Sequence, residues 1–264
     1  MGKGNALFNV SRLIDESVGK EVSVEASFSE DLKRCIEKLS IRDSKPSPFY
    51  KPSSLSCIRN MYYQRTSADI DSSGMSADLF GICESGTDRH LRIQNYIFSM
   101  KNYGIDCEYV KVSDYLLEHS LPDLEIVEEH EYETKLFNKR YNLRFLADGL
   151  IRYKGKYYLL EIKTESYSKW MLRTGVDTHH YNQAFAYSLS FHIPEVMFIY
   201  ENRDCCSKKC YLFAVSDENR QMIADKIDNC ESYVIKHIVP SKPEDVDRKT
   251  CSYCEYRTQC RKDR

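Results

Sequence analysis

Glu161, Ile162 and Lys163 form the part of the sequence that is best suited to chemistry. They end a nearly continuous apolar and aromatic run over residues 157–163, a pattern typical of an interior strand that is covered on both faces. Because side chains alternate along a strand, Glu161 and Lys163 project from the same face. Burial of such groups is costly unless each is paired or bound to a metal ion, so they form either a structural ion pair or part of a metal site.

A second carboxylate, Asp148, lies 13 residues before Glu161, in another apolar run over residues 145–151. We expect two adjacent strands, joined by a turn around residues 154–156, to bring the two carboxylates together. Carboxylate oxygens are the ligands that hard divalent cations prefer. The two carboxylates and Lys163 therefore predict a divalent-cation site inside a sheet.

The charge of the chain is unevenly distributed around this group. The 264 residues carry a formal net charge of −2, but residues 135–173 hold ten Lys and Arg against three Asp and Glu, whereas residues 106–131 are strongly acidic. Positive charge around a carboxylate site attracts a phosphodiester substrate. Solvated surface charge explains the same pattern, so the charge does not decide the function alone.

Cys251, Cys254 and Cys260 form a C-x2-C-x5-C cluster late in the sequence. Closely spaced thiolates can bind one metal centre, but three ligands are one short of the four that zinc or an iron–sulfur cluster uses. The cluster therefore predicts a metal site whose fourth ligand comes from elsewhere in the chain.

The composition is that of an ordinary globular protein, with 42% hydrophobic and 30% charged residues and enough chain for one large domain with attachments. No segment approaches the ~20 apolar residues that a membrane-spanning helix needs, and the first residues lack the apolar core of a signal peptide. We therefore expect an intracellular, cytoplasmic protein without membrane contact. Its 11 cysteines are then thiols or metal ligands rather than disulfides.

The elements that must position these residues follow an α/β pattern. This pattern predicts a mixed central sheet flanked by helices. We divide the chain into an accessory segment (1–50), a core with a helical insertion (51–238) and a cysteine segment (239–264). The expected helices lie within 1–41, where Ser29 is the expected cap, and over 56–64, 77–103, 177–191 and 217–236; the expected strands are 125–134, 141–152, 156–164, 195–200 and 209–215.

The ordered set of motifs resembles the RecB-like branch of the PD-(D/E)XK (restriction-endonuclease-like) nucleases that carries a 4Fe–4S cluster. That branch includes the CRISPR-associated adaptation exonucleases. The resemblance covers about residues 54–262 and departs from the family at Phe145, where the family often has glycine three residues before the aspartate. The residues that carry it occur in the family's order: Cys57, His90 after Gly86, Asp148, Glu161-Ile162-Lys163, Gln183 and Tyr187 in a Q-x-x-x-Y motif, then Cys251, Cys254 and Cys260.

The resemblance implies a role for each residue at the cation site. Lys163 would position or deprotonate the attacking water, or stabilise the transition state. Gln183 would orient the water or Lys163, and Tyr187 would contact phosphate; their spacing places both on one helix face, although helix–sheet packing explains the pair too. The implied ligands of Mn²⁺ or Mg²⁺, of which the histidine favours Mn²⁺, are His90, Asp148, Glu161 and the carbonyl of Ile162.

The resemblance also implies that Cys57 is the fourth ligand, beside the three late cysteines, of a structural 4Fe–4S cluster. This cluster would connect the C-terminal cysteine segment to a helix early in the sequence. Cys57, Cys251, Cys254 and Cys260 would be its four ligands, and zinc is the alternative metal. The cluster would pin segments that are far apart in the sequence.

From these features we expect a metal-dependent DNA nuclease, an exonuclease rather than an endonuclease, that acts on single-stranded DNA or DNA ends. One alternative is a nuclease subunit of a recombination, replication or CRISPR-adaptation assembly, in which residues 1–50 dock a protein partner. Another is a non-catalytic DNA-binding module that keeps the cluster. The intact set of Asp148, Glu161 and Lys163 favours the enzyme, because a decayed site has no reason to keep buried charges.

Overall fold

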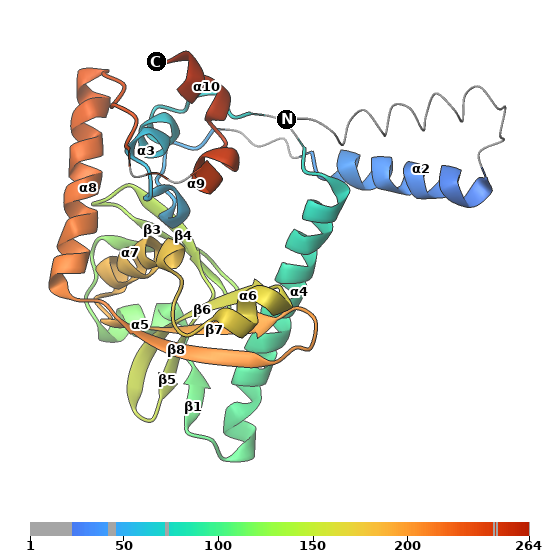
Figure 1. Cartoon of the computed structure of the whole chain (residues 1–264). Helices are drawn as coiled ribbons and strands as arrows, with labels where there is room; N and C mark the ends of the chain where they lie inside the picture. Colours follow the sequence, from blue (N-terminus) through green and yellow to red (C-terminus); the bar gives the residue numbers. More distant parts are fainter. Residues whose placement is uncertain (1–22, 42–45, 72–73, 245, 247, 264) are drawn as a thin grey trace, which may run out of the picture. The chain divides into compact units, whose positions relative to one another are not determined.

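The computed structural model describes residues 23–41, 46–71, 74–244, 246 and 248–263 (Figure 1). The chain folds as two compact units. The smaller unit comprises residues 1–43 and 72–82, and the larger comprises residues 44–71 and 83–264. The helix expected within residues 1–41 therefore lies partly outside the described residues.

In the smaller unit, helix α2 spans Val24–Leu39. Its N-cap is Ser23, whose hydroxyl accepts a hydrogen bond from the backbone N–H of Ala26 at 3.3 Å. The prediction that Ser29 caps this helix is wrong, since Ser29 lies inside it. Serine is a good N-cap residue at either position, and the sequence alone does not show whether the helix begins after Ser23 or after Ser29.

The larger unit contains a five-stranded mixed sheet. Strands β6 and β7 are parallel, and the other neighbouring pairs are antiparallel. The mixed central sheet predicted from the sequence is therefore confirmed. The strands follow the spatial order β1 (Cys107–Tyr109), β5 (Gly149–Tyr153), β6 (Lys156–Glu165), β7 (Glu195–Asn202) and β8 (Lys208–Ala214).

A second, antiparallel sheet consists of β2 (Leu124–Glu129), β3 (Thr134–Asn138) and β4 (Leu143–Ala147). The predictions of single strands over 125–134 and 141–152 are wrong. The first region reverses direction at residues 130–133, and the second passes from one sheet to the other at Asp148. The reversal was missed because residues 130–133 contain no glycine, proline or asparagine to mark a turn.

Helices flank the five-stranded sheet, and the chain is a mixed α/β protein (Figure 1). The helices expected over 56–64, 77–103, 177–191 and 217–236 are present within a few residues, whereas strand β1 and the short helices α5, α6, α9 and α10 were not predicted. No helix of the described residues is long and apolar enough to cross a membrane. The helices of the larger unit are α3 (Ile58–Arg65), α4 (Ala77–Ser99, from Cys83 onward), α5 (Val112–Glu118), α6 (Tyr167–Leu172), α7 (Tyr181–Phe191), α8 (Asp217–Lys236), α9 (Arg248–Ser252) and α10 (Arg257–Lys262).

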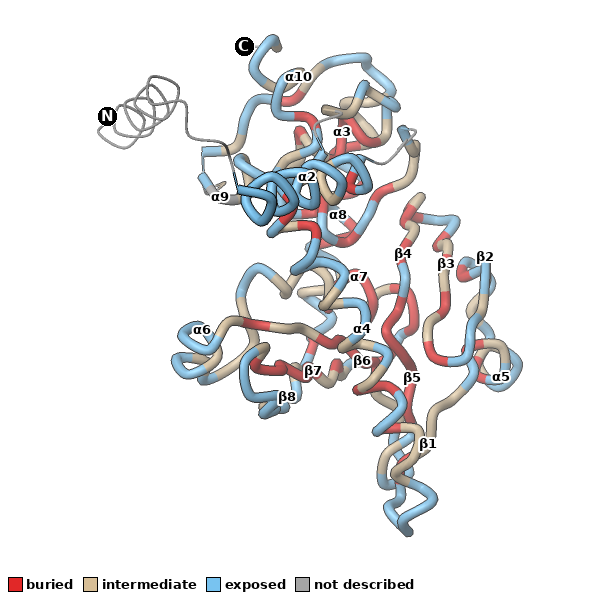
Figure 2. The backbone as a smooth tube through the Cα atoms, turned by 90° about the vertical axis from the view of Figure 1, so that its right-hand side faces the viewer, coloured by how far each residue is buried: buried red, intermediate tan, exposed pale blue. Residues whose placement is uncertain are grey.

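Two apolar clusters cover the two faces of the five-stranded sheet, whose central strands are largely buried (Figure 2). Leu159 of β6 belongs to the cluster formed with α7 and α8, whereas Leu160 and Ile162 belong to the cluster formed with Ile93 and Ile97 of α4. The alternation along β6 thus follows the pattern expected of a strand buried on both faces. It fixes the face from which Glu161 and Lys163 project.

Candidate metal centre and cysteine pocket

Asp148 is the single residue between β4 of the smaller sheet and β5 of the larger one. In the antiparallel pair of β5 and β6, Gly149 lies opposite Leu160, so one further step places Asp148 opposite Glu161. The two-residue turn of Lys154 and Gly155, both with positive φ (50° and 77°), sets this register. The predicted approach of Asp148 to Glu161 is therefore confirmed.

The position of Asp148 is fixed by hydrogen bonds to its side chain and to its backbone. Its Oδ2 accepts a hydrogen bond from the backbone N–H of Ile162 at 2.7 Å. Its carbonyl accepts from Gln94 Nε2 at 2.8 Å and from the Tyr109 hydroxyl at 3.3 Å. Tyr109 also packs so closely on Gly149 that a Cβ there would lie 2.5 Å from its ring. The aspartate is buried and has little freedom to move.

Glu161 is 1% exposed, and its Oε1 contacts the ammonium group of Lys163. Its carboxylate is buried, and the Tyr187 hydroxyl is the other polar group beside it. Burial raises the pKa of Glu161 more than the charge of Lys163 lowers it. A buried carboxylate with so few partners is costly, and a cation would stabilise its charged form.

Burial lowers the pKa of Lys163, but the charges of Glu161 and Asp148 outweigh it and the net pKa is raised. The ammonium group is thus protonated at neutral pH. It faces the same two carboxylates from which the sequence predicted a cation site.

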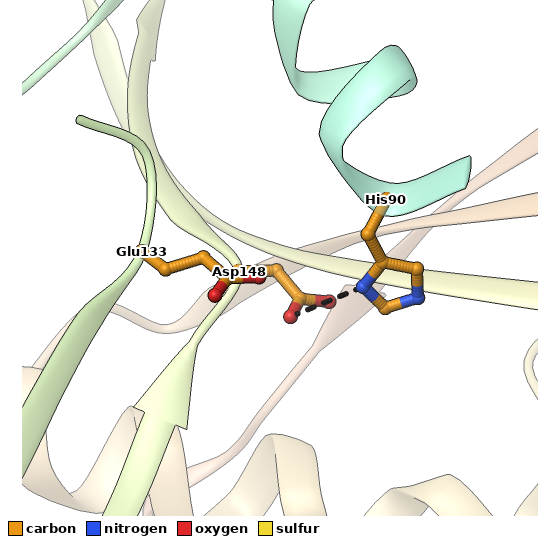
Figure 3. A group of neighbouring side chains, drawn as sticks. All are labelled: His90, Glu133 and Asp148. Atoms are coloured by element: carbon orange, nitrogen blue, oxygen red, sulfur yellow. Dashed lines mark ion pairs between the residues drawn. The ribbon is translucent and has the colours of Figure 1, made fainter. Parts of the chain in front are cut away.

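His90 projects from α4 toward Asp148, with 3.6 Å between its Nδ1 and Asp148 Oδ1 (Figure 3). Burial lowers the pKa of His90, but the hydrogen bond and charge of Asp148 raise it further, so the net shift is upward. The ligand atoms of His90, Asp148 and Glu133 all lie within 4.8 Å of one another. Glu161 is not a member of this group, and Glu133 was not predicted.

The signal that could have identified Glu133 is strand register. In the pair of β3 and β4, Thr134 lies opposite Ala147, so the residues one step further are Glu133 and Asp148. The pair can be recognised only if the turn before β3 is known. The single strand predicted over 125–134 runs through that turn, so the pair was not predicted.

Gln183 and Tyr187 lie on one face of α7, as predicted. Gln183 Nε2 donates a hydrogen bond to the Tyr187 hydroxyl at 2.8 Å, and that hydroxyl donates to the carbonyl of Leu146 at 3.1 Å. Tyr187 is buried, and burial raises its pKa well above the ordinary value. Its ring lies 5.0 Å from that of Phe145, which explains how the strand accommodates a large residue there.

Two cavities adjoin this group and share Lys51, Ser53 and Gln183. One, of about 510 Å³, is lined by Glu133, Gln183 and Tyr187 and by basic side chains. The other, of about 850 Å³, extends from Lys163 to the cysteine segment. The basic residues that line them are Lys51, Lys135 and Arg144 in the first cavity and Lys51, Lys163 and Lys169 in the second.

His180 borders the larger cavity, and its Nδ1 lies 2.9 Å from the Tyr200 hydroxyl. Burial, followed by the positive charge of Lys163, lowers the pKa of His180 to about 3. This imidazole is therefore neutral at physiological pH, unlike Lys163.

The four cysteines of the predicted cluster line one pocket of about 230 Å³. Cys57 is the N-cap residue of α3, and the other three lie on or beside the short helices α9 and α10. Nitrogen donors approach two of the sulfurs: Asn60 Nδ2 lies 3.4 Å from Cys254 Sγ, and Arg59 Nη1 lies 3.6 Å from Cys260 Sγ. Such N–H donors stabilise thiolates that bind a metal centre.

The spacing of the sulfurs bears on which metal centre fits the pocket. Among the described residues, no three cysteine sulfurs lie within 4.8 Å of one another. Tetrahedral zinc with Zn–S bonds of ~2.3 Å would hold its sulfurs ~3.8 Å apart. The cysteine sulfurs that line the pocket are therefore not at the mutual spacing of a tetrahedral zinc site.

A scan against models of protein families matches none of them, and a search of curated proteins finds no relative. Among solved structures, the crystal structure of SSO0001 is similar to 92% of this chain over 100% of its own, with 15% sequence identity and a TM-score of 0.45. A likeness this weak supports no inference about function.

Proposed function

We propose that this protein is a metal-dependent DNA nuclease of the RecB-like PD-(D/E)XK type that acts as an exonuclease on single-stranded DNA or DNA ends. The observation that carries the proposal is a buried group of two carboxylates and one ammonium: Glu161 is 1% exposed and lies between Asp148 and the protonated Lys163. The single charge of Lys163 neutralises only one of the two carboxylates. A divalent cation would offset the remaining negative charge.

The types of donor suit such a cation, and two of them, His90 and Asp148, already lie together. His90, Asp148, Glu161 and the carbonyl of Ile162 would hold Mn²⁺ or Mg²⁺, and the imidazole favours Mn²⁺. A bound cation lowers the pKa of a coordinated water and offsets the charge that develops on a phosphate. The approach of His90 to Asp148 at 3.6 Å supports this assignment.

The surrounding residues have roles that their contacts suggest. Lys163 contacts Glu161 and borders the larger cavity, where it would position the attacking water or stabilise the negative charge of the transition state. Gln183 is held by Tyr187 and borders both cavities, where it can orient water or substrate. The Tyr187 hydroxyl bonds Gln183 and Leu146 and lies beside the Glu161 carboxylate, so we assign it a positioning role.

The two cavities support a nucleic-acid substrate. They adjoin at Gln183, and each is lined by three basic and two acidic side chains, of which the basic ones suit phosphates. A strand that follows both cavities passes Lys163 and reaches the cysteine segment. This path favours a single strand or a frayed end over an intact duplex.

The cysteine pocket fits a structural 4Fe–4S cluster with Cys57, Cys251, Cys254 and Cys260 as ligands. Cys57 and Cys251 are 194 residues apart in the sequence, so ligation would join segments that are otherwise distant. The cluster would fix one wall of the larger cavity, since Cys254 lines both that cavity and the pocket.

The test compares two glutamates of the same strand. Protein purified anaerobically is incubated with end-labelled single- and double-stranded DNA, with and without Mn²⁺ or Mg²⁺. We expect metal-dependent cleavage that Glu161→Gln abolishes. Glu165→Gln is the matched control, because Glu165 is also buried on β6 but is paired with Arg173.

Cleavage that persists in Glu161→Gln would contradict the assignment of this site. No cleavage by wild-type protein with a full cluster would instead favour the alternative of a partner-activated subunit or a DNA-binding module. A partner-activated subunit would cut DNA once its partner protein is added, whereas a DNA-binding module would still not cut.

A further inference from the structure

The turn between β2 and β3 brings a third carboxylate to the metal centre. Glu133 ends this turn, and its carbonyl accepts a hydrogen bond from the His130 N–H at 2.9 Å. The half-buried carboxylate of Glu133 makes no hydrogen bond or ion pair with a described residue. It lies instead beside the carboxylate of Asp148 (Figure 3).

Two carboxylates at this distance repel each other unless a positive charge lies between them. His90 pairs with Asp148 and does not form an ion pair with Glu133. Donor atoms that share one cation at ~2.1 Å are ~3.0 Å apart when adjacent and ~4.2 Å when opposite. The three donors lie within 4.8 Å of one another, so small side-chain rotations bring all of them onto one ion.

We propose that Glu133 is a ligand of the divalent cation, in addition to the four ligands that the family resemblance implies. One imidazole and two carboxylates then bind the cation on the side of Asp148 that faces β3, a donor set suited to Mn²⁺. This inference rests on the proposed metal-dependent function for its biological meaning, but not for its test.

The position of Glu133 also gives the cation a route to substrate. Glu133 lines the cavity of about 510 Å³ together with Gln183, Lys135 and Arg144. A cation held by Glu133 is therefore reached from that cavity, where the basic side chains attract phosphate. The three-stranded sheet thus contributes a ligand as well as structural support.

The experiment measures binding of Mn²⁺ alone, without DNA. Cluster-containing protein is titrated with Mn²⁺, and the free ion is counted by electron paramagnetic resonance. Loss of an outer hydrogen-bond partner of a metal ligand costs ~10- to 100-fold in affinity, so we expect Glu133→Gln to weaken Mn²⁺ binding at least ~10-fold. Glu128→Gln is the matched control, because Glu128 lines the same cavity but is outside the group.

Iron content and the melting temperature of each variant report whether the fold is intact. If Glu133→Gln is misfolded, Glu133→Asp takes its place, since it keeps the charge but shortens the side chain; a partial loss of affinity is then expected. Wild-type Mn²⁺ affinity in the folded Glu133 variant would overturn the proposal.

The outcomes separate this proposal from the proposed function. Absence of Mn²⁺ binding by the wild-type protein would overturn both. Binding that depends on Glu133 in a protein that does not cut DNA would support the ligand and refute the nuclease.

Discussion

The metal centre and the cysteine pocket are assembled in opposite ways. Asp148 and Glu161 are 13 residues apart, and one hairpin brings them together. Cys57 and Cys251 are 194 residues apart, and no strand pairing joins their segments. Backbone hydrogen bonds therefore fix the first site, whereas the second relies on short helices, a few N–H donors and the metal centre that it would bind. Substitutions in the two regions should have different consequences.

The largest effect is expected at the cysteine pocket. Cys254→Ala should lose the iron and lower the stability by about 3 kcal/mol or more, because binding energy at a structural metal centre is folding energy. Iron analysis and thermal unfolding measure both. Cys210→Ala, in strand β8 away from the pocket, is the control. A full complement of iron in Cys254→Ala would remove this residue from the ligand set.

At the metal centre the loss should be in activity alone. Lys163→Met should reduce DNA cleavage by about 10²- to 10³-fold, since it removes a cation aimed at developing negative charge. Mn²⁺ affinity and iron content should persist, because Lys163 is not a ligand. Lys156→Met, at the other end of the same strand and lining neither cavity, is the control. Loss of iron in Lys163→Met would mean that the two regions are not independent.

A third effect, on the pH dependence of stability, is expected at His180, which borders the larger cavity between the two regions. The pKa of His180 is lowered from 6.5 to about 3, so below pH 6.5 the unfolded chain binds a proton that the folded protein excludes. Stability is unaffected above pH 6.5 and falls between pH 6.5 and about 3. His180→Gln should remove this loss, which is worth about 1 to 2 kcal/mol at pH 5. Urea unfolding of both proteins at pH 7 and pH 5 measures it; equal pH dependence would exclude His180 as the cause.

The smallest effect is expected at Tyr187. Tyr187→Phe removes the half-buried hydrogen bond from its hydroxyl to the carbonyl of Leu146, at a cost of about 1 kcal/mol. It also frees Gln183, and we expect cleavage to fall about 10-fold, a smaller loss than an oxyanion donor causes. Tyr181→Phe on the same helix is the control. Unchanged cleavage in Tyr187→Phe would assign Gln183 and Tyr187 to packing.

The sequence predicted best what depends on local pattern. The strand that carries Glu161 and the long helix α8 were expected over nearly their full lengths, because periodicity and caps mark them. The approach of Asp148 to Glu161 followed from one short turn with glycine at its second position. The spacing of Cys251, Cys254 and Cys260 likewise identified three thiols that line one pocket.

What escaped prediction depends on contacts between segments. The turn at residues 130–133 has no turn-forming residue, so two strands were taken as one. Glu133 was therefore not predicted as a site residue, because only the pairing of β3 with β4 places it opposite Asp148. The short β1 and α5 carry too few residues for a periodic signal.

The turn at Lys154 and Gly155 also bears on the order of folding. A hairpin has low contact order and forms in about 1–10 μs, whereas closure of a loop of nearly 200 residues waits for the rest of the chain. During synthesis the two carboxylates can meet while Cys251, Cys254 and Cys260 are still inside the ribosome. If the pocket binds the proposed cluster, the nascent chain would bring Asp148 and Glu161 together before it could accept iron, and cluster insertion would be a late step of folding.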